Sequence, residues 1–162
     1  MALILFDTNI FIDMLVGCKE AMLELAAYDE PAISMITYME LRAGGVARPM
    51  DKAILDEVLS TFKVYPIEWE IAEQAITLRG NSLLNPPKIK LPDAIIGATA
   101  VRWKIPLVTR NPKDFSSLPV PVHVPYDYNS VTGIVSNVRK PYGSLPSPLL
   151  KMAVRRERSD SA

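Results

Sequence analysis

Four carboxylates stand where the predicted strands give way to helices. Asp7 follows a run of five apolar residues at positions 2–6, and Glu40, Asp93 and Asp114 each lie beside such a junction or in the first turns of a predicted helix. A short, continuous apolar run is typical of a strand buried on both faces of a parallel sheet. Ligands of open α/β sheets bind beyond the carboxyl ends of the strands. We therefore expect the four carboxylates to share one edge of the sheet.

Carboxylates that converge in this way repel one another, and some of them take up protons unless a cation offsets their charge. Hard divalent ions such as Mg²⁺ and Mn²⁺ prefer oxygen ligands and keep several bound waters. One or two such ions can activate a water and neutralise a phosphodiester during in-line displacement. The pattern indicates metal-assisted phosphodiester hydrolysis.

Each carboxylate also has a simpler interpretation. Asp7 could cap the helix that follows it, and Asp93 could be stabilised by the helix dipole alone. Glu40 could be a solvated helix residue, and Asp114 could serve a turn in an Asn-Pro loop. For each residue taken alone, the simpler interpretation is at least as good as the metal-site interpretation. The order and context of all four favour the site.

The elements that would position these residues alternate along the chain. Apolar spacing and turn residues predict short strands at 2–6, 32–35, 64–65, 106–109 and 120–124. Helices are predicted between them, at about 8–15, 19–28, 37–43, 51–62, 68–84 and 93–103. Such alternation implies right-handed crossovers and a parallel sheet with helices on both faces.

Four ordered segments carry a family resemblance: FDTNIFI at 6–12, YMELRAG at 38–44, LPDAIIGATA at 91–100 and LVTRNPKDF at 107–115. Together they resemble a PIN domain, and among PIN domains the VapC-type toxins of bacterial toxin–antitoxin pairs. The resemblance covers residues 1–126. It implies a three-layer α/β/α sandwich around a mostly parallel five-stranded sheet. It also implies a Mg²⁺- or Mn²⁺-dependent endoribonuclease, often a homodimer, that is inhibited by a cognate antitoxin.

The same resemblance implies roles for individual residues. It assigns four metal ligands, acting directly or through water: Asp7, Glu40, Asp93 and, at a more variable position of the family, Asp114. Thr8 would orient a metal-bound water, and Asn111 would support the same network. Arg110 is either a phosphate contact or a solvated loop residue.

Residues 127–162 have no counterpart in this resemblance. We expect an extended tail with a short helix at 148–157, and the tail carries six basic residues against three acidic ones. It could pack on the domain or on a second copy, contact RNA phosphates as a basic arm, or occupy the antitoxin groove.

The composition favours a cytoplasmic protein. The formal net charge is zero, Cys18 is the single cysteine, and neither a signal peptide nor a membrane-spanning stretch is expected. A catalytically silent PIN module that binds RNA or protein is the alternative. A phosphatase of the haloacid dehalogenase type would need a second Asp where Asn9 stands. We expect Asp13 on solvated helix surface, Trp69 in the core and His123 without a partner.

Overall fold

A five-stranded parallel sheet forms the centre of the computed structural model, which describes residues 3–143. The strand order is β3-β2-β1-β4-β5, so β1 lies in the middle. The strand bounds are β1 Leu3–Phe6, β2 Glu30–Ser34, β3 Lys63–Tyr65, β4 Leu107–Val108 and β5 Val122–His123. The last two are shorter than the sequence predicts, but all five expected strands are present. The fold is the predicted three-layer α/β/α sandwich.

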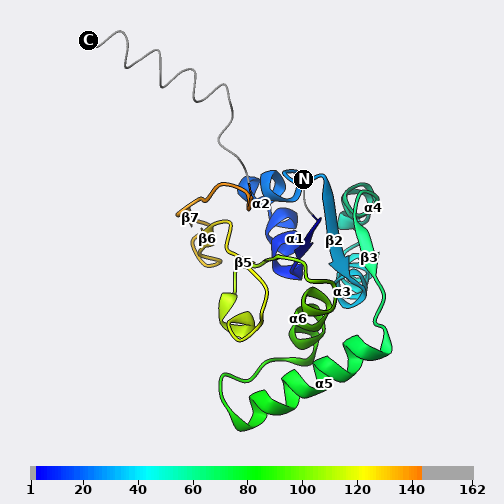
Figure 1. The fold of residues 1–162 in the computed structure, drawn as a ribbon. Coiled ribbons are helices and arrows are strands. Elements are labelled where there is room, and N and C mark those ends of the chain that lie inside the picture. The colour runs from blue at the N-terminus through cyan, green and yellow to red at the C-terminus, as the bar shows by residue number, and fades with distance from the viewer. Residues whose placement is uncertain (1–2, 144–162) are drawn as a thin grey trace, which may run out of the picture.

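Helices cover both faces of this sheet (Figure 1). Their bounds are α1 Thr8–Leu15, α2 Lys19–Leu25, α3 Met35–Ala47, α4 Lys52–Leu59, α5 Trp69–Leu84 and α6 Leu91–Trp103, with short 3₁₀ turns η1 at Pro49–Asp51 and η2 at Pro112–Phe115. The alternation of side chains along β1 separates the two layers. Ile4 and Phe6 pack with α1, α2 and α4, whereas Leu5 packs with α6.

The parallel register brings the carboxyl ends of the strands to one edge. Leu5 pairs with Ala32 of β2 and with Leu107 of β4, and Phe6 pairs with Val108. The chain therefore leaves β1, β2 and β4 side by side and enters α1, α3 and the η2 loop at neighbouring points. This is the edge at which the candidate site residues were expected.

Two helices differ from the sequence prediction. Gly44 and Gly45 do not end α3, which continues to Ala47. Gly45 instead leaves space for α4, because a Cβ there would lie 3.3 Å from Leu55 Cδ1. Helix α5 buries Ile71 and Ala75 and leaves the Trp69 side chain 74% exposed. The expectation that Trp69 lies in the core is wrong, because α6 covers the neighbouring face of α5.

Residues 127–143 are more ordered than the expected extended tail. Strand β6 (Asp127–Tyr128) pairs antiparallel with β7 (Val135–Ser136), and Tyr126 just before this hairpin is 1% exposed. Strands of two residues are too short to leave a periodic sequence pattern. The predicted helix at 148–157 lies outside the described residues, and the domain boundary at 126 stays a prediction.

Within the described part of the chain, none of the helices combines the length and the apolar character that a bilayer crossing requires.

Replacing Gly80 with Ala should raise the free energy of unfolding by up to about 1 kcal/mol, because glycine is a poor residue inside a helix. Gly80 lies within α5, and a Cβ there would meet nothing within 4 Å. Urea denaturation measures the effect. Gly97→Ala in α6 is the control, because its Cβ would lie 2.9 Å from Leu118 Cδ1 and this close contact should cancel the gain. Equal stabilisation by both changes would contradict the described packing of α6.

Candidate active site

Asp7 is buried at the centre of the sheet edge, with 5% of its surface exposed. It is the N-cap of α1, and one carboxylate oxygen accepts the Thr8 N–H at 2.7 Å. The other oxygen accepts the Thr109 hydroxyl at 2.8 Å and the Asn9 side-chain amide at 3.3 Å. Asp7 therefore caps the helix and also belongs to a polar network that joins β1 to β4.

Glu40 reaches this edge from the second turn of α3. The Thr8 hydroxyl donates to Glu40 Oε1 at 3.0 Å and also lies 3.0 Å from the Thr37 hydroxyl oxygen. Thr8 was expected to orient a metal-bound water, and here its hydroxyl orients the carboxylate of Glu40. Glu40 itself is exposed at the mouth of the site.

Asp93 and Asp114 approach from the opposite helical layer. Asp93 lies in the first turn of α6, where the helix N-terminus favours a negative charge, and Asp114 lies in η2. The Asn111 side-chain amide donates to Asp114 Oδ2 at 3.2 Å. Both carboxylates are partly exposed, so they are accessible from solvent.

Two of the four carboxylates, Asp7 and Asp93, have a raised pKa. Burial raises the pKa of Asp7 to about 6, and the charges of Asp93 and Glu40 add to this against the hydrogen bond from Thr109. Burial also raises the pKa of Asp93 to about 6, reinforced by the charges of Asp114 and Glu40 and opposed by Lys90. All four sequence-predicted acidic residues are thus brought into one electrostatic cluster.

The donor chemistry of this cluster fits a hard divalent cation, because carboxylates that hinder each other's ionisation are relieved by a positive charge between them. Within residues 3–143, however, no group of three or more His, Cys, Asp or Glu side chains is arranged to hold a metal ion. The carboxylates form an open cluster in the structure and not a closed coordination shell.

Comparison of the chain with known protein families covers the segment that holds this site. The family model described as the PIN domain matches residues 4–120, a segment that contains every carboxylate of the cluster. The chain belongs to the PIN-domain family. No curated protein matches it significantly.

Solved structures with a similar fold include one toxin–antitoxin complex with high sequence identity. A toxin–antitoxin complex from Klebsiella pneumoniae is 42% identical, with a TM-score of 0.65 and coverage of 76% of this chain and 98% of that chain. FitAcB from Neisseria gonorrhoeae is 24% identical, with a TM-score of 0.64 over 75% of this chain and 97% of that one. VapBC2 from Rickettsia felis, bound to a DNA fragment from its promoter, is 24% identical, with a TM-score of 0.65 over 75% and 98%. The last two show the fold alone.

Sequence reasoning missed Thr109 and Asn9 as parts of this PIN-domain site. The Thr109 hydroxyl donates to Asp7 and accepts from the Asn111 N–H at 3.0 Å and the Asn9 amide at 3.3 Å. Thr109 is fully buried. Both residues lie in the quoted motifs, but nothing in their spacing shows that they bond to each other across 100 residues.

Two expectations about charged residues were also wrong. Asp13 is 1% exposed, not solvated, because α1 turns it toward Arg110 and Tyr126. His123 does have a neighbour, since its Nε2 lies 3.5 Å from Glu24 Oε1, although His123 Nε2 makes no hydrogen bond in the structure. Burial lowers the pKa of His123 and raises that of Glu24. This pair was hidden because its members are distant in sequence.

Replacing Thr109 with Val should lower the free energy of unfolding at pH 7 by about 1–3 kcal/mol, because the change removes a donor to the buried Asp7 carboxylate and the acceptor of the Asn111 N–H. The Asn9 side-chain amide keeps its bond to Asp7. Valine keeps the shape of the side chain. Chemical denaturation measures the loss. Thr77→Val is the matched control, because Thr77 is exposed on α5 and its hydroxyl contacts only the Glu73 carbonyl at 3.2 Å among the hydrogen bonds of the described residues. Equal effects at the two threonines would contradict the network.

Proposed function

We propose that this PIN domain is a Mg²⁺- or Mn²⁺-dependent endoribonuclease and the toxin of a toxin–antitoxin pair. The observation that carries the proposal is the electrostatic cluster of Asp7, Glu40, Asp93 and Asp114, in which two carboxylates have their pKa raised to about 6. Proteins rarely keep several carboxylates in one partly buried place without a cation to bind there. The family membership and the order of the motifs support the same activity.

Several of the described residues hold the carboxylates in place, and the exposed side of the cluster leaves space for a substrate. Thr109 and Asn9 hold Asp7, Thr8 holds Glu40, and Asn111 holds Asp114. Asp93 stands at the helix N-terminus with its side chain partly exposed. A bound Mg²⁺ or Mn²⁺ would supply the activation of water and the neutralisation of phosphate charge that phosphodiester hydrolysis requires.

The direct test is isothermal titration of Mn²⁺ into the protein, with a gel assay of RNA cleavage under the same conditions. A DNA oligonucleotide of the same sequence serves as the substrate control. We expect saturable Mn²⁺ binding, cleavage of RNA, and loss of cleavage in chelator. Cleavage that persists in chelator would refute the metal-dependent mechanism. Metal binding without cleavage of any RNA tested would favour the binding-module alternative.

The toxin role rests on the 42% identical relative, which was solved as a toxin–antitoxin complex. An RNA substrate would place this chain in the cytoplasm. Exposed apolar side chains at the C-terminal end of α1 and on α2, among them Val16 and Leu23 at 58% and 61% exposure, offer surface for a protein partner. Induced expression should arrest bacterial growth for the wild type and not for the Asp93→Asn variant. Light scattering of the purified chain tests the expected homodimer.

A further inference from the structure

A partly buried ion pair joins α1 to the loop that carries Thr109 and Asn111. Asp13, near the end of α1, has 1% of its surface exposed. Its carboxylate accepts two bonds from the Arg110 guanidinium, one from Nε to Oδ2 and one from Nη2 to Oδ1 at 2.9 Å. The Tyr126 hydroxyl donates to Asp13 Oδ2 at 2.8 Å. Such a two-point pair fixes the orientation of the guanidinium as well as its position.

Arg110 stands between the two residues that support the carboxylates. Thr109, on one side, donates to Asp7, and Asn111, on the other, donates to Asp114. The Arg110 backbone N–H donates to the Asn9 side-chain oxygen at 3.4 Å. The loop is thus attached to the first turn of α1 through Asn9 and to the last turns of α1 through Asp13.

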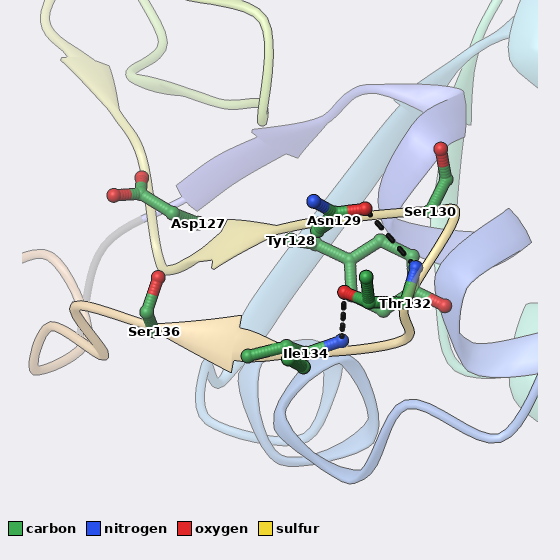
Figure 2. A pocket seen from close by; sticks show the side chains of 7 residues that line it. All are labelled: Asp127, Tyr128, Asn129, Ser130, Thr132, Ile134 and Ser136. Atoms are coloured by element: carbon green, nitrogen blue, oxygen red, sulfur yellow. Dashed lines mark hydrogen bonds between the residues drawn. The ribbon is translucent and has the colours of Figure 1, made fainter.

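Residues beyond the matched PIN segment complete this attachment. That segment ends at residue 120, whereas Tyr126 contacts Asp13 and the Tyr128 ring lies under the guanidinium, with Arg110 Cζ 5.3 Å from the ring centroid. Tyr128 belongs to the β6–β7 hairpin shown in Figure 2, whose turn is closed by bonds from Thr132 N to Asn129 and from Ile134 N to Thr132. Two aromatic residues of the C-terminal segment therefore support the ion pair, Tyr128 through Arg110 and Tyr126 through Asp13.

We propose that Arg110 is a positioning residue for the acidic site. The C-terminal segment contributes to the nuclease site because Tyr126 and Tyr128 support the Asp13–Arg110 pair. The Asp13–Arg110 pair holds the 109–114 loop so that Thr109 and Asn111 present Asp7 and Asp114 to the metal. This inference rests on the proposed metal-dependent function. The sequence left Arg110 as either a phosphate contact or a solvated loop residue, and this inference gives it a third role, because Asp13 engages its Nε and Nη2 atoms.

Metal affinity is the first test. Arg110→Lys keeps the charge but loses the two-point geometry, and Tyr128→Leu removes the aromatic ring from a partly exposed position where loss of folding is not expected. Both should weaken Mn²⁺ binding by about 10-fold or more, the range typical of lost partners behind metal ligands. The control is Leu59→Ala, a core change in α4 that lowers stability and alters none of the hydrogen-bonding residues of the loop or its attachment. An unchanged Mn²⁺ affinity in Arg110→Lys and Tyr128→Leu would overturn the proposal.

Amide hydrogen exchange without metal separates this inference from the proposed function. Exchange of the 109–114 segment should quicken in Arg110→Lys and Tyr128→Leu more than in Leu59→Ala, because the Arg110 and Asn111 amides lose their fixed acceptors. If the segment exchanges equally in all three variants, the pair acts only on global stability and the proposal fails. A wild type that binds no Mn²⁺ would refute the proposed function, and the exchange result would still decide whether Arg110 positions the loop.

Discussion

Asp93→Asn is expected to lower the rate of RNA cleavage by more than about 100-fold, since even the loss of a partner behind a metal ligand commonly costs 10–100-fold. The change removes one negative charge from the cluster and keeps the size of the side chain. Asp93 lies in the first turn of α6 and is partly exposed, so the helix should form without its carboxylate. A gel assay with matched protein and Mn²⁺ concentrations measures the rate.

The matched control is Glu73→Gln, which makes the same carboxylate-to-amide change on the exposed surface of α5. Its cleavage rate should stay within about twofold of the wild type, because surface charges far from a site contribute little. Circular dichroism of both variants verifies that the fold is retained. Full activity in Asp93→Asn would show that the acidic cluster does not carry the reaction.

In chelator, the same Asp93→Asn change is expected to stabilise the protein above pH 6. The pKa of Asp93 is raised to about 6 from its ordinary 3.8, so the folded state binds the proton more tightly than the unfolded state. Stability attributable to the protonated acid is therefore present below pH 4 and lost as the pH rises to 6. The full shift corresponds to about 3 kcal/mol, which solvent screening of this partly exposed side chain reduces to about 1–2 kcal/mol.

The measurement is the difference in free energy of unfolding between Asp93→Asn and the wild type, by urea denaturation from pH 4 to pH 8. Subtraction cancels the titrating groups that do not interact with Asp93, such as His123, whose lowered pKa gives the opposite slope. Asp7 does not cancel, because the charge of Asp93 is one cause of its raised pKa, and its relief adds to the difference. The difference should be near zero at pH 4, grow to pH 6 and then level off. Saturating Mn²⁺ should reverse it by stabilising the wild type alone. A difference that does not depend on pH would contradict the electrostatic cluster.

These two expected results together mean that the protein gives up folding stability at this site in return for function. The wild type keeps Asp7 and Asp93 where burial and neighbouring charge oppose their ionisation, although an amide at position 93 would give a larger free energy of unfolding. Active sites are commonly the places where a protein retains such unfavourable groups. In this chain a divalent cation would remove the penalty, so metal binding and folding should be coupled.

The sequence by itself determined the sheet and the acidic residues of the site. The apolar run at 2–6 is typical of a strand buried on both faces, and the residue after such a strand stands at the edge where ligands bind. The strand–helix alternation then sets a parallel sheet, which brings Glu40, Asp93 and Asp114 to that edge. These features follow from local pattern and from the ordered motifs of the PIN domain.

Only the tertiary structure decided which side chains serve those carboxylates. Asp13 looked like solvated helix surface, because its environment depends on Arg110, 97 residues away, and on Tyr126, 113 residues away. The sequence also failed to predict that Trp69 is exposed and that β6 and β7 form a hairpin, for the same reason. Periodicity reports whether a face of a helix or strand is apolar, but a polar group is buried only when distant residues supply its hydrogen bonds. Those partners are set by the packing of the folded chain.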